Sequence, residues 1–272
     1  MRSNNEYRAE ARKKLFGNYG TVIGAYILYT LILNLLSAPL SLIASFESIL
    51  PIPRLGFLAS VPVSLIISVV SVLFAAGVDK ISYDIAYDRK GDVNDIFYCF
   101  KHEPFTVVFS YLWIFLRMLP GIIIFSVGMI VFTVLTISGM SGNSFVIAVV
   151  VLSVTSVIYL IWIFWVKLSV SMTYFLYYEK PGMSARDLVE TSVRMMKGNK
   201  GRLFGLYLSY FGYYLLAVLS CGLALLWLNP NITVSTALFY DDLKNRGEGI
   251  YVNVEPEKNT ASDTYYHQEY WN

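Results

Sequence analysis

Two basic residues, Arg117 and Lys167, are the only charged residues between Pro104 and Tyr178. An ionisable side chain inside a membrane segment is costly and usually functional, so this pair is a candidate site for an anion or a lipid headgroup. Both residues also fall where predicted spans meet the cytoplasmic border, and long basic side chains at that depth can reach the headgroups. Arg117 and Lys167 can therefore form a binding site, or they can simply extend their side chains to the lipid headgroups at the membrane surface.

A second candidate site is the tripeptide Asn229, Pro230 and Asn231, in the last and weakest apolar segment. Proline removes a helical hydrogen bond, so we expect the helix to be interrupted here. Carbonyl groups at a broken membrane helix can bind a cation, although a kink used only for packing is the simpler reading. No Asp or Glu falls inside a predicted span, which counts against a transporter coupled to protons or sodium.

The sequence carries no common enzyme signature. It has no Walker lysine loop, no Gly-x-Ser-x-Gly elbow and no His-Glu-x-x-His motif. His102 and His267 lie far apart and outside the spans, and Cys99 and Cys221 fit neither a disulfide framework nor a zinc cluster. We therefore expect a protein that is not an enzyme and holds no cofactor or metal. The basic residues flank the spans, so they need no nucleic acid partner.

The spacing of charges predicts the elements that must position these residues. Hydrophobic residues make up 56% of the chain and charged residues 15%, and the charges are crowded between long apolar stretches. About 20 helical residues cross a bilayer core, and continuous apolar runs exclude barrel strands, which alternate. We predict an all-α, polytopic transmembrane helical bundle of about six spans, at Thr21–Ser45, Phe57–Val78, Met118–Ser138, Ser144–Trp165, Leu203–Leu219 and, more weakly, Gly222–Asp242.

Lysine and arginine are distributed unevenly between the spans. The N-terminal segment and the polar segments Asp79–Glu103 and Glu179–Arg202 are rich in both, whereas the alternate connections hold only Arg54. Because cytoplasmic loops carry the excess of basic residues, we predict a multi-pass protein of the cell (cytoplasmic) membrane with a cytoplasmic N-terminus. Six spans place the C-terminus in the cytoplasm, and five spans place it outside.

An internal repeat divides the membrane domain, residues 1–243. The segments Arg12–Gly20 and Arg194–Gly201 are both basic, both end in Gly-Asn-x-Gly and both precede a span. We predict three hairpin units at about 5–78, 92–178 and 184–243. The alternative is that similar loop residues arose independently at each membrane border. The polar tail, 244–272, lacks aliphatic residues for a core, so we expect it to be disordered or to offer its aromatic end to a partner.

Each unit is expected to begin with a cytoplasmic amphipathic helix on the membrane surface, its basic face toward anionic lipid headgroups. In the middle unit one helix face carries Val93, Ile96, Phe97 and Phe100. Asp92 is the expected N-cap of that helix, and Ser184 begins the third with a capping-box pattern. Gly17 and Gly198 stand where a helix commonly ends in a left-handed residue.

The C-terminal part of the chain resembles an uncharacterised family of bacterial multi-pass membrane proteins, domain-of-unknown-function family 975. The resemblance rests on Met196–Lys200, Leu208–Leu216, Gly222, Pro230 and Phe239-Tyr240, together with Ala11–Asn18 and Val166–Met172. The chain departs from the family pattern at three places: Tyr213 stands where the family has Trp, Leu223-Ala224 replaces Ile-Gly, and Asn231 replaces Tyr. The region 121–159 is also expanded. The resemblance implies an integral membrane protein and supplies no catalytic residue.

These observations favour a non-enzymatic membrane scaffold or accessory protein that binds lipid or partner helices. Gly205, Ser209 and Gly212 are small residues of the kind that allow close helix packing with a partner protein or a second copy. The alternative is a carrier or exporter for a lipid or an amphipathic peptide, including a role in tolerance of membrane-active peptides. A membrane enzyme is a third, weaker reading.

Overall fold

The computed structural model describes residues 2–49, 55–137 and 142–246, and the regular structure in these ranges is entirely helical. The helices in chain order are α1 (Asn4–Leu15), α2 (Tyr19–Ile49), α3 (Leu55–Ala86), the 3-10 helix η1 (Val93–Phe97), α4 (Tyr98–Lys101), α5 (Pro104–Ile137), α6 (Gly142–Val170), α7 (Thr173–Glu179), α8 (Ala185–Met195), α9 (Lys200–Leu208), α10 (Phe211–Leu219) and α11 (Leu225–Asn245). The predicted all-α class is confirmed. The predicted tail beyond residue 246 lies outside the described residues.

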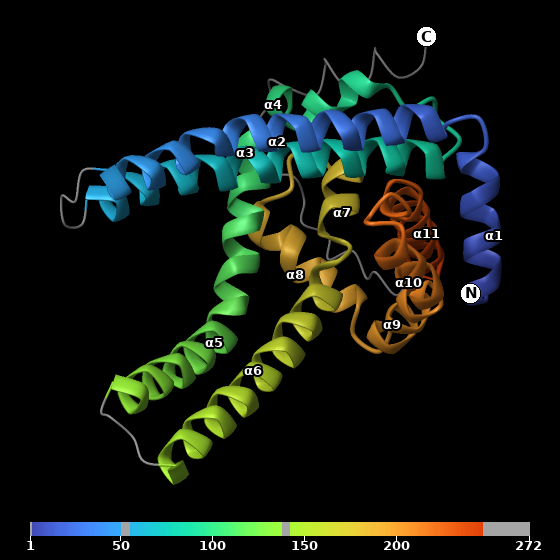
Figure 1. Ribbon diagram of the computed structural model, residues 1–272. Coiled ribbons are helices and arrows are strands. Elements are labelled where there is room, and N and C mark those ends of the chain that lie inside the picture. The colour runs from blue at the N-terminus through green and yellow to red at the C-terminus, as the bar shows by residue number, and fades with distance from the viewer. Residues whose placement is uncertain (1, 50–54, 138–141, 247–272) are drawn as a thin grey trace.

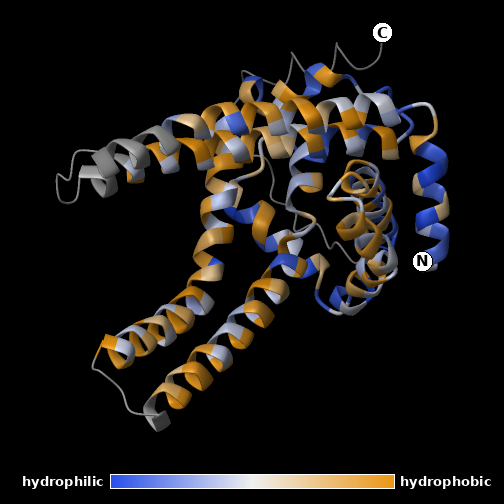
Figure 2. Ribbon diagram, viewed as in Figure 1, coloured by the Kyte–Doolittle hydropathy of each residue, from blue (hydrophilic) through white to orange (hydrophobic). Residues whose placement is uncertain are grey.

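Two long helical hairpins, α2–α3 and α5–α6, project from a shared centre toward the same side of the molecule (Figure 1). Four segments are long and apolar enough to cross a membrane: Tyr19–Pro39, Ser60–Ala86, Pro104–Ile137 and Phe145–Glu179. The first three lie in α2, α3 and α5, and the fourth continues from α6 through α7. These segments contain the greater part of the first four predicted spans. The hairpins are coloured mainly as hydrophobic, whereas α1 is mainly hydrophilic (Figure 2). Large apolar side chains exposed along the hairpins fit a bilayer and not water.

Small residues explain why α5 and α6 pair closely. A Cβ atom added at Gly121 would lie 2.5 Å from the Trp162 side chain, and one added at Gly128 would lie 2.1 Å from Thr155. Between them the rings of Phe125 and Tyr159 stack at 4.9 Å. Residues 121, 125 and 128 share one helix face, so the two glycines let the backbones approach on both sides of the aromatic pair.

The third hairpin consists of α9 and α10 on one side and α11 on the other. Helices α9 and α10 are inclined to each other by 41°, so together they form either one broken span or a re-entrant segment. Contacts from Tyr213 to Trp227 and from Tyr210 to Ser235 show that α11 runs antiparallel to them. This is the arrangement expected for a third hairpin.

The sixth predicted span, Gly222–Asp242, is not supported as an independent crossing. The helix α11 covers most of this segment, but it does not reach the hydropathy of the four candidate spans among the described helices. Its polar residues and the burial of eleven of its side chains give the physical reason. Helix α11 is enclosed by other helices, and such a helix does not need an apolar surface for lipid.

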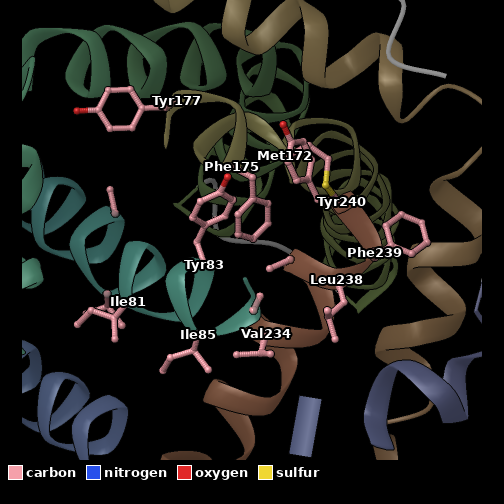
Figure 3. Close-up of a cluster of buried hydrophobic side chains, with 14 of the residues drawn as sticks. Ile81, Tyr83, Ile85, Met172, Phe175, Tyr177, Val234, Leu238, Phe239 and Tyr240 are labelled. Carbon is pink, nitrogen blue, oxygen red and sulfur yellow. The ribbon is translucent and has the colours of Figure 1, made fainter. Parts of the chain in front are cut away.

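The largest buried cluster lies where the second half of α3, the short helix α7 and α11 meet (Figure 3). Tyr83 of α3 contacts Phe175 of α7 with ring centroids 6.1 Å apart, and Phe175 in turn contacts Tyr240 of α11 at 5.6 Å. Tyr240 also donates a 2.6 Å hydrogen bond to Glu179, and Lys244 forms an ion pair with the same carboxylate. These contacts fix α11 against α7, which in turn packs on α3.

The amphipathic segments use their apolar faces differently from the expectation. Tyr7, Ala11 and Leu15 of α1 are fully buried in the main core, and α8 buries Leu188 and Met195. Their apolar faces therefore pack on other helices of the protein and not on lipid. The middle segment keeps two large aromatic rings at the surface, Phe97 and Phe100, which contact Phe74, and Phe16 is also exposed at the end of α1.

The local signals at the ends of these segments are confirmed. Gly17 and Gly198 have φ of 88° and 87°, and each separates an amphipathic helix from the next membrane helix. Asp92 caps η1 with a complete capping box, and Ser184 accepts the amide of Asp187 at the start of α8. The boundaries of the three predicted units remain predictions.

Helix α1 is tethered to α11 through Asp242. Its carboxylate accepts the Arg2 amide at 3.0 Å and the Tyr7 hydroxyl at 2.7 Å, and the Arg2 guanidinium lies 3.8 Å away. Burial of Asp242 is the largest single influence and by itself raises the pKa. The hydrogen bonds from Arg2 and Tyr7 and the charge of Arg2 together outweigh burial, so the pKa of Asp242 lies below its ordinary value.

This lowered pKa predicts an acid-dependent loss of stability. A carboxyl whose pKa is lower in the folded state stabilises the protein above its unfolded pKa of about 3.9, and the contribution disappears as the pH falls further. The Asp242→Asn variant is expected to lose about 1.5 kcal/mol at neutral pH, the strength of a hydrogen bond to a charged group. Thermal unfolding of both proteins from pH 7 to pH 3 should show a difference that shrinks with acidification. A difference independent of pH would contradict this role for Asp242.

Candidate functional site

A cavity of about 360 Å³ lies where α3, α5, α6, α7, α9 and α11 meet. Its apolar lining consists of Ile114, Met118, Val170, Phe175 and Ile232. Its polar lining consists of Asp79, Tyr111, Lys167, Ser171, Tyr174, Tyr207, Thr233 and Thr236. Pockets of this size, with an apolar wall and a few convergent polar groups, are typical of small-molecule sites.

Asp79 is the residue that the sequence reasoning missed. The second span was expected to end at Val78, whereas α3 continues to Ala86 and its candidate membrane segment includes both Asp79 and Asp84. The expectation that the spans contain no carboxylate is therefore wrong. The missed signal is the lack of any Gly or Pro from residue 78 to residue 90, so nothing in the sequence stops the helix at its first charge.

The carboxylate of Asp79 is partly buried and points into a tyrosine-rich region. Its charge reaches Tyr26 of α2, Tyr174 of α7 and Tyr207 of α9. Within the described part of the chain it forms no hydrogen bond and no ion pair. The neighbouring Lys80 is already paired with Asp84. A carboxylate of this kind is available to a ligand.

The two predicted basic residues have different surroundings. Lys167 lines the cavity, whereas Arg117 is not among the lining residues. The backbone carbonyl of Arg117 accepts a hydrogen bond from the indole N–H of Trp162 at 3.2 Å. The positive charge of the Arg117 side chain acts on Glu190 of α8 and Lys200 of α9. Arg117 thus faces α8 and α9, and a shared anion site for the two residues gains no geometric support.

The predicted interruption at Asn229, Pro230 and Asn231 does not occur. Helix α11 continues through Pro230, and the chain instead breaks between α10 and α11, where Gly222 has φ of 89°. The Asn231 side chain is buried, donates to the Trp227 carbonyl at 2.7 Å and accepts the Tyr19 hydroxyl at 3.3 Å. The internal bonds of Asn231 account for its burial without a ligand.

The two cysteines have different surroundings in the structure. Cys99 is buried and Cys221 exposed, both as free thiols, and burial raises the pKa of Cys99 to about 12. A thiol with so high a pKa is a poor nucleophile. No group of His, Cys, Asp and Glu suited to a metal occurs among the described residues.

The fold and the composition together define an all-α polytopic membrane protein. A family model described as "Protein of unknown function (DUF975)" matches residues 1–247. The chain therefore belongs to this family, as its sequence motifs predict. No curated protein and no solved structure matches the chain.

Proposed function

We propose that this protein is a non-enzymatic scaffold or accessory protein of the cytoplasmic membrane that holds an amphipathic ligand, a membrane lipid, between its helices. The cavity carries the proposal. One part of its lining offers charged and hydroxyl groups suited to a headgroup, and the other offers Ile, Met, Val and Phe side chains suited to an acyl chain. It also lies among segments apolar enough to cross the bilayer, from which a lipid can enter sideways.

The proposed topology keeps both ends of the described chain in the cytoplasm. The N-terminal segment is basic, which favours the cytoplasmic side. Arg2 and Tyr7 bond to Asp242 near the end of α11, so these two regions must lie on the same side of the membrane. An even number of crossings between them is therefore required. Either α9–α10 is re-entrant, or α11 returns across the membrane inside the protein.

Filling the cavity tests the proposal. Thr233 lines it and lies on α11, so the Thr233→Phe variant is expected to exclude the lipid. Both proteins are purified as the full chain in a neutral detergent. The Thr233→Phe protein should carry at least about fivefold less phospholipid per molecule than the unchanged protein, because phenylalanine occupies part of the 360 Å³ cavity. Lipid phosphorus and mass spectrometry of the extracted lipids would measure the loss.

The Thr133→Phe variant is the matched control. The Thr133 hydroxyl donates to the Met129 carbonyl, as the Thr233 hydroxyl donates to the Asn229 carbonyl, but Thr133 is exposed on α5 outside the cavity. This variant should retain as much lipid as the unchanged protein. Equal retention by all three proteins would refute lipid binding in the cavity.

A second candidate function, a carrier or exporter for a lipid or an amphipathic peptide, is favoured by the bend beside the cavity. Tyr207 lines the cavity one residue before α9 ends, and α10 then departs at 41°. Helix ends at such breaks can act as hinges. In reconstituted vesicles a carrier would transfer a labelled lipid between leaflets, whereas a scaffold would bind the lipid without transfer.

A further inference from the structure

The charges in and around the cavity indicate which headgroup fits it. Asp79 supplies a carboxylate within a candidate membrane segment, and Lys167 supplies the only basic group among the lining residues. The two side chains do not form an ion pair among the described contacts, and Lys167 is exposed. Lys167 can therefore extend toward the membrane surface, whereas Asp79 stays among the helices.

The other basic groups near Asp79 are already engaged. Lys80 pairs with Asp84 and lies 5.1 Å from the ring centroid of Tyr98. Arg89 lies 3.5 Å from the same Asp84 carboxylate. Two basic side chains, Lys80 and Arg89, thus pair with Asp84, and neither pairs with Asp79. A carboxylate in a membrane segment that lacks a partner must acquire a proton or a positive charge from elsewhere.

The surroundings of Asp79 suit a positively charged ligand. Tyr111, Tyr174 and Tyr207 line the same cavity, and Phe175 adds a fourth ring. Aromatic faces attract organic cations, and a carboxylate among such rings is a common arrangement for binding an alkylammonium group. Ile114 and Val170 extend the lining with apolar surface that an attached hydrocarbon chain can contact.

We propose that the cavity binds the alkylammonium headgroup of a membrane amphiphile, with the Asp79 carboxylate as its counter-charge. This inference rests on the proposed function, because it assigns the chemical class of the ligand held in the same cavity. An amine-bearing lipid brings its own positive charge, which satisfies Asp79, while its chain occupies the apolar part of the cavity.

Amphiphiles that share a dodecyl chain test this assignment. The full chain, in a neutral detergent, is titrated with dodecyltrimethylammonium, dodecyl sulfate and dodecyl maltoside, and tryptophan fluorescence reports binding. Dodecyltrimethylammonium is expected to bind about tenfold more tightly than the sulfate, a difference of about 1.4 kcal/mol. Tetramethylammonium, which lacks the chain, is expected not to compete. Competition by this free ion at similar concentration would overturn the amphiphile part of the proposal.

The Asp79→Asn variant should lose the preference for the ammonium headgroup, and Asp88→Asn should keep it. Asp88 is an exposed carboxylate just beyond α3, and its left-handed φ of 57° is one that asparagine tolerates. If Asp79→Asn does not fold, Lys167→Gln replaces it, because removing a positive charge from the cavity should strengthen ammonium binding.

The outcomes separate the two proposals. Unchanged selectivity in Asp79→Asn, weaker ammonium binding in Lys167→Gln, or preference for the sulfate would overturn the role of Asp79 while leaving lipid binding intact. Failure of all three amphiphiles to bind would overturn the proposed function as well. A cationic amphipathic peptide that binds through Asp79 when dodecyltrimethylammonium does not would also reject the lipid assignment.

Discussion

The Gly77→Ala variant is expected to be strongly destabilised, more than either Asn231→Leu or Asp242→Asn. A Cβ atom at residue 77 would lie 2.1 Å from the backbone oxygen of Ile96 and 2.6 Å from its carbonyl carbon. Backbone atoms of the buried Ile96 cannot move aside as a flexible side chain can, so α3 and η1 must separate. Overpacking of this kind costs about 3 kcal/mol. Thermal unfolding in detergent should show a loss of about 6–12 °C.

The Gly24→Ala variant is the matched control, because the same substitution in α2 meets no atom within 4 Å. Alanine favours a helix over glycine by about 1 kcal/mol, so this variant should be as stable as the unchanged protein or slightly more stable. A similar loss of stability in both variants would mean that glycine is required for helix conformation generally and not for the contact between Gly77 and Ile96.

The second large effect is expected for Asn231→Leu. Leucine fills a similar volume but removes the bond to the Trp227 carbonyl and the acceptor of the Tyr19 hydroxyl, which links α11 to α2. Loss of a buried hydrogen-bond partner costs about 2 kcal/mol. The melting temperature of the purified protein should fall accordingly, while lipid retention per folded molecule should not change.

Asn229→Leu provides the comparison for Asn231. The Asn229 side chain is only partly buried and forms no hydrogen bond in the described structure, so its replacement should change stability by about 0.5 kcal/mol or less. If Asn231→Leu kept its stability but lost bound lipid, the tripeptide would be a binding site after all, and the packing role assigned to Asn231 would be wrong.

Several of the residues that carry the family resemblance have structural roles in this protein. Phe239 and Tyr240 are fully buried on α11, and Tyr240 bonds to Glu179. Gly198 and Gly222 adopt left-handed conformations at helix ends. These four residues lie outside the cavity lining, whereas the resemblance segment Val166–Met172 contributes Lys167, Val170 and Ser171 to it. The resemblance therefore covers residues that pack the helices and also part of the cavity wall, while Asp79 lies outside the resemblance segments.

The candidate site was only partly predictable for a simple reason. Lys167 could be found because an isolated charge in an apolar run is visible in the sequence. Asp79 could not be recognised in the same way, since it stands first in a charged segment that resembles a loop, with Lys80 directly after it. The two residues differ in surroundings only after folding, when Lys80 pairs with Asp84 and Asp79 enters the cavity.

The sequence by itself determined the helical class, the two apolar hairpins, the left-handed glycines and the capped amphipathic helices. These features depend on a bilayer that excludes charge and on residues within a few positions of one another. Only the tertiary structure decided that α11 lies inside the protein, that α1 packs on it and that Asp79 faces a cavity. Those outcomes depend on contacts such as that of Tyr7 with Asp242, which are 235 residues apart in the chain. The spacing of residues within one segment does not predict contacts between segments so far apart.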